Sequence, residues 1–168
     1  MQVFLIRHPR PLIGTGFCYG RLDVDCEDAQ PVADRLRPLL PPATPVIASP
    51  LLRARQLAEA LAPQASIDVR LAEIDFGEWE GLSWNEIDRS ALDAWSADVL
   101  GFTPPGGESV ADLQNRVVNF ADALDGPRVA LVTHSGVMRA LIGHWRQLPV
   151  AEWTQLRFEF GSLTEIEI

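Results

Sequence analysis

The chain has 168 residues, 47% of them hydrophobic and 22% charged, and its formal net charge is −9 although it carries 14 basic residues, all of them arginine. This length and composition predict a single domain over residues 1–168 with an apolar core of its own. The acidic surface disfavours nucleic acid and anionic membranes as partners, and no uncharged apolar run approaches the roughly 18 residues of a membrane span.

Short apolar runs and helical spacing alternate in the first half of the chain. Residues 1–7 meet a charge after a short apolar run, which is typical of a strand and not of a signal peptide, so we expect a cytoplasmic protein. The patterns predict strands at 3–6, 45–48 and 67–71 and helices at 28–40 and 50–61. Pro50 fits the first turn of the second helix, with Ser49 as its N-cap.

The second half continues this alternation. Apolar spacing predicts helices at 84–95, 110–124 and 137–145, and an apolar run predicts a strand at 128–133. Ser109, with Asp112 three residues later, is much like a capping box at the start of the middle helix. The tail 156–168 alternates around Gly161-Ser162, which predicts a closing antiparallel pair of strands.

Strands and helices in this order predict an α/β fold. We expect a three-layer sandwich with a mostly parallel central sheet, helices on both faces and antiparallel strands at the C-terminus. Folds of this kind place their chemistry at the carboxyl ends of the strands. The groups that follow the predicted strands are Arg7-His8, the run 49–53, Glu73 and His134-Ser135-Gly136. We therefore expect these side chains to meet at one edge of the sheet.

Two histidines, two arginines and a glutamate at one edge suit phosphoryl transfer. A phosphoryl group needs a nucleophile on one side, a proton donor on the leaving oxygen and positive donors on its equatorial oxygens. A neutral imidazole can attack phosphorus and form a covalent intermediate. Arginine forks, and the backbone N–H groups of a helix that begins near Ser135, bind phosphoryl oxygens.

The runs around these residues resemble the motifs of the histidine phosphatase superfamily, and the similarity covers nearly the whole chain. In order, the runs are Leu5-Ile6-Arg7-His8, Ser49-Pro50-Leu51-Leu52-Arg53-Ala54, Glu73-Ile74-Asp75-Phe76-Gly77-Glu78-Trp79-Glu80-Gly81, Pro105-Gly106-Gly107-Glu108-Ser109 and Val132-Thr133-His134-Ser135-Gly136. Each run alone is weak, whereas all of them in this order are specific. The resemblance implies a phosphatase that needs no cofactor.

Carried over to these positions, the resemblance implies a role for each polar residue at the sheet edge. His8 would accept the phosphoryl group, and Arg7, Arg53 and His134 would bind its oxygens. Glu73 would protonate the departing alcohol and then activate water, and help of this kind is typically worth ~10²- to 10⁴-fold in rate.

The acid-bearing segment leaves alternatives open. Asp75, Glu78 or Glu80 replaces Glu73 as the acid if the loop runs differently. The main chemical rival is a metal site made of the two histidines with Glu73 and Asp75. Two neighbouring arginines suit an anion better than a cation, so we predict no metal ligands.

The sequence departs from the family directly after His8. Pro9 replaces the usual glycine, Pro11 stands where a small hydroxyl residue is often found, and Gly14 stands where asparagine is often found. Proline lacks an N–H, so backbone donors to the phosphate are lost, and Pro9 also biases the backbone of His8 toward extended angles. We take Arg10 as the candidate that compensates.

The Arg-His-Pro-x-Pro run, together with residues 18–23, resembles the α-ribazole phosphatase subgroup, which serves cobalamin assembly. This resemblance implies that Tyr19, Gly20 and Arg21 lie near the pocket mouth, where an aromatic ring can stack on the substrate. We therefore expect a small-molecule phosphomonoester as substrate, with α-ribazole 5′-phosphate as the first candidate.

Other functions remain in competition with this one. A broad-specificity sugar-phosphate or phosphoglycerate-type phosphatase is the first alternative, and a catalytically impaired, phosphate-binding regulatory module is the second. A protein phosphohistidine phosphatase fits less well, because the 73–81 segment is similar to the branch that cleaves alcohol esters. Mutases of the superfamily are longer, so we expect transfer to water. No pattern predicts an oligomeric state.

Overall fold

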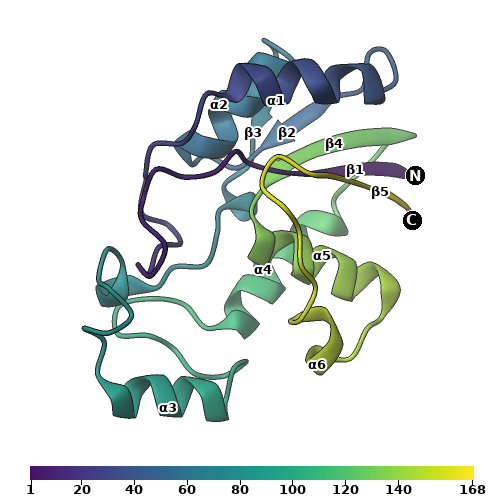
Figure 1. The fold of residues 1–168 in the computed structure, drawn as a ribbon. Helices are drawn as coiled ribbons and strands as arrows, with labels where there is room; N and C mark the ends of the chain where they lie inside the picture. The colour runs from purple at the N-terminus through teal and green to yellow at the C-terminus, as the bar shows by residue number, and fades with distance from the viewer.

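The computed structural model describes residues 1–168 and shows a mixed sheet (Figure 1). Its strands are β1 (Gln2–Arg7), β2 (Val46–Ala48), β3 (Ser66–Ile67), β4 (Arg128–Thr133) and β5 (Leu163–Glu167). They lie in the order β3-β2-β4-β1-β5, and all neighbours are parallel except β5, which is antiparallel to β1. The predicted α/β fold, with a mostly parallel sheet and an antiparallel strand at the C-terminus, is confirmed.

Helices pack on both faces of this sheet. The helices of the chain are α1 (Ala29–Leu36), α2 (Leu52–Leu61), α3 (Arg89–Ala97), α4 (Val110–Ala121), α5 (Ser135–Arg146) and α6 (Val150–Trp153). α1 and α2 cover one face together, and α4 and α5 cover the other (Figure 1). α3 has no buried residue and lies away from the sheet. None of these helices combines the length and the apolar character needed to cross a membrane.

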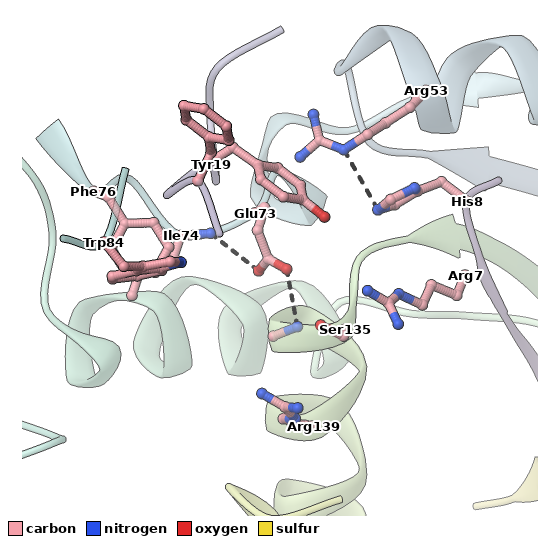
Figure 2. A pocket seen from close by; sticks show the side chains of 12 residues that line it. Arg7, His8, Tyr19, Arg53, Glu73, Ile74, Phe76, Trp84, Ser135 and Arg139 are labelled. Atoms are coloured by element: carbon pink, nitrogen blue, oxygen red, sulfur yellow. Dashed lines mark hydrogen bonds between the residues drawn. The ribbon is translucent and has the colours of Figure 1, made fainter. Parts of the chain in front are cut away.

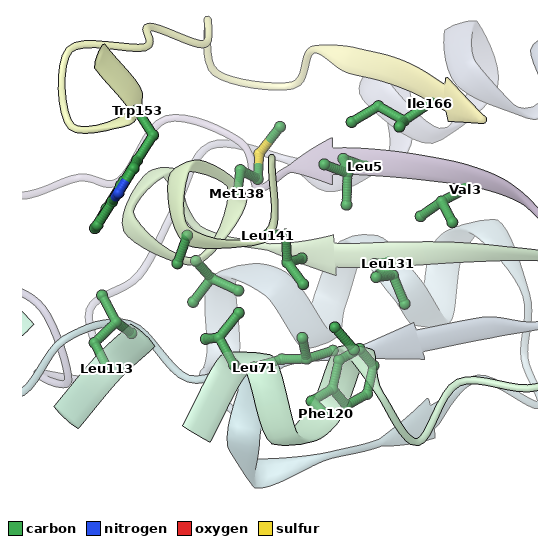
Figure 3. Close-up of a cluster of buried hydrophobic side chains, with 14 of the residues drawn as sticks. Val3, Leu5, Leu71, Leu113, Phe120, Leu131, Met138, Leu141, Trp153 and Ile166 are labelled. Atoms are coloured by element: carbon green, nitrogen blue, oxygen red, sulfur yellow. The ribbon is translucent and has the colours of Figure 1, made fainter. Parts of the chain in front are cut away.

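Both faces of the central strands are buried, because successive side chains of a strand point to opposite sides. Along β1, Val3 and Leu5 belong to the core on the side of α4 and α5, whereas Phe4 and Ile6 belong to the core on the side of α1 and α2. Figure 3 shows the first of these cores, in which Leu131 of β4 also takes part. Parallel strands whose two faces are both covered by helices have sequences that are apolar throughout. This explains why the sequence alone identifies them.

The register of the sheet brings the predicted site residues together. Arg7 at the end of β1 pairs with Thr133 at the end of β4, so His8 and His134 follow at the same edge. β2 ends one position earlier in this register, and the backbone N–H of Ser49 donates to the carbonyl of Val132. The carboxyl ends of β1, β2 and β4 therefore share one edge, as expected for parallel strands.

Two predicted elements begin or end elsewhere, for reasons that lie in local hydrogen bonds. The helix predicted at 50–61 starts at Leu52 with Leu51 as N-cap, so the assignment of Ser49 as the cap is wrong. The strand predicted at 67–71 is wrong beyond Ile67. There the carboxylate of Asp68 accepts from the backbone N–H of Arg70 and starts a 3₁₀ turn.

Two further expectations fail because contacts distant in sequence decide the structure. The helix predicted at 84–95 begins only at Arg89, capped by Asp88, and Trp84 instead stacks on Trp95 with ring centroids 5.9 Å apart. In the tail, only β5 is a strand, and it pairs with β1 instead of with residues 156–160. By contrast, the capping box of Ser109 and Asp112 at the start of α4 is confirmed.

Candidate active site

A cavity of about 280 Å³ opens at the carboxyl edge of the sheet (Figure 2). Its size is close to the lower end of the range for small-molecule sites. The walls come from β1, α2, the 73–76 segment, α5 and the loop before α1. The lining residues are Arg7, His8, Phe17, Tyr19, Arg53, Glu73, Ile74, Phe76, Trp84, Ser135, Gly136 and Arg139.

His8 presents a neutral imidazole at the base of this cavity. The residue is 2% exposed, and burial, helped by the neighbouring Arg53 guanidinium, lowers its pKa from 6.5 to about 3. Its Nδ1 lies 2.6 Å from the carbonyl of Pro9, which can only accept, so Nδ1 carries the proton. Nε2 therefore keeps its lone pair, as a nucleophile must.

Arg7 is held in place by the tail of the chain. Its guanidinium stacks on the ring of Phe160 at 3.7 Å, and its Nη1 donates to the carbonyl of Phe158 at 2.6 Å. The buried Nε of Arg7 makes no hydrogen bond. Phe160 also packs against the His8 ring, with centroids 5.6 Å apart. The segment before β5 thus fixes Arg7 and His8 together and leaves a cationic donor unused.

Arg53 comes from the first turn of α2 and is fully buried. Its Nε donates to His8 Nε2 at 3.4 Å, and its Nη atoms donate to the carbonyls of Gly20 at 2.6 Å and Leu22 at 3.0 Å. The loop that holds these carbonyls is itself anchored by Glu80. That carboxylate accepts from the N–H groups of residues 20, 21 and 22, each at 2.9 Å.

His134 lies beneath the cavity and is fully buried. Its ring packs on that of His8 with centroids 4.9 Å apart, and its Nε2 lies 2.7 Å from Ser49 Oγ. Ser49 Oγ accepts from the backbone of Leu51, and where its own hydrogen goes to His134 Nε2, the ring proton is on Nδ1. That Nδ1 is buried without a hydrogen-bond partner, and His134 is not among the residues that line the cavity.

Glu73 occupies the opposite wall, at the N-terminus of α5. Its Oε2 accepts from the backbone N–H of Gly136 at 3.0 Å and its Oε1 from that of Ile74 at 3.1 Å (Figure 2). A Cβ at position 136 would lie only 2.3 Å from Glu73 Oε1. The glycine is therefore what lets the carboxylate approach the helix end.

The other acids of this segment point elsewhere. The carboxylate of Asp75 accepts from Gly77 N and lies 3.9 Å from Arg21, Glu78 is exposed, and Glu80 holds backbone N–H groups. Glu73 is the only acid of the segment among the residues that line the cavity. No group of three histidine, cysteine or acidic side chains is arranged to hold a metal ion.

Four predicted binding residues do not line the cavity: His134, which is fully buried beneath it, and Arg10, Gly20 and Arg21. Arg10 is exposed, and its side chain lies 3.7 Å from Glu27 and 5.1 Å from the ring centre of Phe160. Arg21 faces Asp75 and Glu108 outside the pocket. Gly20 is buried and takes part only through its backbone, because a Cβ there would lie 1.9 Å from the carbonyl of Ile74.

The cavity wall also holds residues that the sequence patterns did not identify. Phe17, Phe76 and Trp84 join Tyr19 in an aromatic wall. Arg139 adds a third arginine, and its position four residues after Ser135 places both on one face of α5. That spacing was the available signal for Arg139. The aromatic residues gave none, because contacts between distant segments bring them together.

This arrangement can bind a phosphoryl group and transfer it. An unprotonated imidazole nitrogen, the half-buried guanidinium of Arg7, the buried one of Arg53 and a helix N-terminus border the same space. A carboxylate stands across from the nucleophile, where a leaving oxygen needs a proton. Tyr19 also lines the cavity, with the Arg53 guanidinium 5.5 Å from its ring centre.

Comparison with known proteins finds relatives along the whole chain. The model of the histidine phosphatase superfamily (branch 1) matches residues 3–168. A glucosyl-3-phosphoglycerate phosphatase of Mycolicibacterium vanbaalenii is 31% identical over 183 aligned positions, which cover 92% of this chain and 78% of that protein. An adenosylcobalamin/α-ribazole phosphatase of Salmonella typhimurium is 30% identical over 135 positions, which cover 73% of this chain and 66% of that protein.

Solved structures show the same extent of similarity. The protein TTHB049 from Thermus thermophilus has a TM-score of 0.80 and 32% identity to this chain, with 99% of this chain and 94% of that one covered. The likeness therefore includes the sheet, its covering helices and the loops at its carboxyl edge.

Proposed function

Because this chain belongs to branch 1 of the histidine phosphatase superfamily and is a phosphomonoesterase of that superfamily, we propose that it hydrolyses a sugar-phosphate or phosphoglycerate-type ester through a phosphohistidine on His8. The observation that carries this proposal is the state of the His8 ring. It is neutral, buried and held by Pro9 in the tautomer whose Nε2 is unprotonated and faces only the long hydrogen bond from Arg53 Nε at 3.4 Å.

In the first step, His8 Nε2 attacks phosphorus and the bond from phosphorus to the alcohol oxygen breaks. Arg7 and Arg53 flank the phosphoryl group, and the unpartnered Nε of Arg7 and Nδ1 of His134 donate to its oxygens. The N-terminus of α5 at Ser135 adds backbone donors and a positive dipole end. These donors are fixed before the substrate arrives, which is what makes such stabilisation effective.

Glu73 serves the leaving group in this scheme. Its carboxyl group gives a proton to the departing alcohol oxygen, and the alcohol leaves. In the second step Glu73 takes a proton from water, the water oxygen attacks phosphorus, and the bond between phosphorus and Nε2 breaks. Phosphate is released and His8 returns to its starting state, so no other reactant is consumed.

Pro9 follows His8 and lacks a backbone N–H, and this loss is the reason to consider an impaired, phosphate-binding module. The structure favours an active enzyme, because a proline keeps its carbonyl, and the Pro9 carbonyl is the partner of His8 Nδ1. What Pro9 removes is only a backbone N–H. The unused donors on Arg7 and His134 offer the phosphoryl group other partners.

Two observations bear on the alcohol part of the substrate. The longer alignment, over 92% of the chain, is with the glucosyl-3-phosphoglycerate phosphatase, which supports a sugar or phosphoglycerate ester. The aromatic wall of Tyr19, Phe76 and Trp84 suits the flat face of a sugar ring. It also suits a planar base, and this keeps α-ribazole 5′-phosphate as the second candidate.

A substrate panel in the presence of a chelator tests this proposal. We expect turnover of phosphoglycerates, glycosylated phosphoglycerates and sugar phosphates with a higher kcat/KM than of α-ribazole 5′-phosphate or nucleotides. A preference for α-ribazole 5′-phosphate would replace the first candidate by the second. Loss of activity with the chelator would instead support a metal enzyme, and no turnover of any phosphoester would contradict the proposal.

A further inference from the structure

Arg139 is the arginine of the cavity for which phosphoryl transfer has no use. It projects from the second turn of α5, one turn below Ser135 (Figure 2). Its Nε donates to the carbonyl of Leu156 at 2.7 Å, and neither of its Nη atoms makes a hydrogen bond within the chain. A half-buried guanidinium with free, forked donors in a binding cavity is suited to a carboxylate or a phosphate.

Its position is on the leaving-group side of the cavity. His8 attacks from one side, so the alcohol departs on the other, where Glu73 stands. Glu73 lies against Gly136, and its charge acts on the Arg139 guanidinium. A group attached to the departing alcohol, and not the phosphoryl group itself, therefore comes closest to Arg139.

A second pocket continues the cavity on this side. It has a volume of about 340 Å³ and shares Ile74, Phe76, Gly136 and Arg139 with the first. The rest of its lining is mainly apolar, including Trp95 of α3. Arg139 is thus a cation at the junction of the first cavity and an apolar pocket, on the side to which the proposed reaction sends the alcohol.

The charges of the cavity leave one cation uncompensated. Arg7, Arg53 and Arg139 face a single acid, Glu73, and the His8 ring is neutral. A phosphomonoester brings two negative charges, and Glu73 must be protonated when the alcohol departs. Three guanidinium groups then face a dianion, so a further monoanionic group on the substrate would balance the cavity.

We propose that Arg139 binds a carboxylate on the leaving alcohol, so that the enzyme prefers phosphate esters of hydroxycarboxylic acids to their neutral counterparts. This inference rests on the proposed phosphatase function and narrows its substrate class. It makes Arg139 a specificity-determining residue, since the carboxylate is not part of the phosphoryl group that is transferred.

The test compares two esters that differ in one group. 3-Phosphoglycerate carries a carboxylate where glycerol 3-phosphate carries a neutral hydroxymethyl group. We expect the wild-type enzyme to show a higher kcat/KM for 3-phosphoglycerate. In Arg139→Gln, the ratio of the two kcat/KM values should fall on the order of 10- to 100-fold, as for the loss of a charge-assisted pair of hydrogen bonds.

The matched control is Arg146→Gln, which removes the same charge from an exposed position in the last turn of α5. In this variant, the ratio of kcat/KM for 3-phosphoglycerate to kcat/KM for glycerol 3-phosphate should equal that of the wild type. Because both kcat/KM values come from the same enzyme preparation, partial unfolding of a variant cancels from the ratio.

Two results would overturn the inference while the phosphatase function stands: a wild-type enzyme without preference for the carboxylated ester, or an Arg139→Gln ratio equal to that of Arg146→Gln. The first needs no variant at all, so it decides the matter even if Arg139→Gln fails to fold. If the enzyme hydrolyses neither ester, the inference is overturned as well. A chromogenic phosphoester, given to the same preparation, then separates two cases. If it is hydrolysed, only the inference about Arg139 fails; if it is not, the proposed phosphatase function fails too.

Discussion

At the scale of single residues, the site depends on which backbone atoms a side chain meets. Pro9 illustrates this, because the sequence alone suggested only a lost donor. The structure shows that the atom in use is the carbonyl of Pro9, which proline retains, and that it sets the tautomer of His8. A substitution that looks disruptive by residue type thus keeps the hydrogen bond that sets the tautomer of the His8 ring.

Gly136 provides a test of Glu73 at this scale. A Cβ at this position would meet Glu73 Oε1 at 2.3 Å, and the end of a flexible side chain can move away. Gly136→Ala should therefore keep or slightly raise the melting temperature, since alanine favours a helix over glycine by about 1 kcal/mol. It should lower kcat for alkyl phosphates at least ~10-fold, because the displaced carboxyl group no longer reaches the leaving oxygen.

The leaving group separates this effect from general damage. Nitrophenolate needs little proton assistance, so Gly136→Ala should lower kcat for 4-nitrophenyl phosphate much less than for an alkyl phosphate. Equal losses for both esters would show that Glu73 is not the proton donor, and the same pair of esters should report the same pattern in Glu73→Gln.

At the scale of elements, loops far apart in sequence hold the phosphoryl site. Glu80 accepts from three consecutive N–H groups of the loop at 20–22, and carbonyls of that loop hold the Arg53 guanidinium. The backbone of Phe76 donates to the same carboxylate. Glu80 is therefore a positioning residue that acts on Arg53 through the loop, although its motif made it only an alternative acid.

Glu80→Gln should loosen this loop, because the amide nitrogen cannot accept and would face N–H donors. We expect KM for a chromogenic phosphoester and the inhibition constant of inorganic phosphate both to rise about tenfold, as for a lost charge-assisted hydrogen bond. Glu78→Gln is the matched control, since Glu78 is two residues away and exposed. If the two variants bind phosphate equally well, the loop does not depend on Glu80.

The predicted elements that are confirmed and those that are not differ in where their contacts come from. Strands at 3–6, 45–48 and 128–133 are clear because burial on both faces makes their sequences apolar throughout. The helix predicted at 84–95 is confirmed from Arg89 onward and is wrong before it, because Trp84 packs on Trp95 across a turn, and helical spacing cannot reveal such a contact. Alternation along the sequence likewise cannot reveal the contacts of the tail. There, backbone carbonyls of residues 156–160 accept hydrogen bonds from arginine side chains, and the segment does not pair with a strand.

At the scale of the whole molecule, the order of strands explains how much of the site was predictable. Parallel strands bring whatever follows them to one edge, so His8, Arg53 and His134 could be grouped without a structure, whereas Glu73 follows a 3₁₀ turn and not the end of a strand. Arg139 was missed because it lies a full turn inside α5. The donors left unused on Arg7 and His134 could not be foreseen either, since they depend on how all neighbouring groups pair.

Two buried neutral histidines also make the stability of the whole molecule depend on pH. Burial lowers the pKa of His8 from 6.5 to about 3 and that of His134 well below 6.5. Below pH 6.5 the unfolded chain binds protons that these folded rings refuse, so stability is complete above that pH and falls as the pH drops toward 3.

Urea unfolding at pH 7.5 and pH 5 measures this effect. A single such histidine contributes a loss of about 2 kcal/mol over this interval, from 1.36 kcal/mol per pH unit below the unfolded pKa. His8→Asn cannot titrate at this position, so its stability should fall less than that of the wild type. Equal falls in the two proteins would mean that the His8 ring takes up a proton in the folded state.

The most direct test of the account is to find the phosphoryl group on the enzyme. We predict that a chromogenic phosphoester, added with a chelator and quenched in alkali during turnover, leaves an acid-labile phosphate on His8, which peptide mass spectrometry locates. His8→Asn, with the remaining pocket intact, should carry none and turn over no ester. Turnover by the wild type without phosphorylated His8, or a phosphate on any other residue, would contradict the central claim.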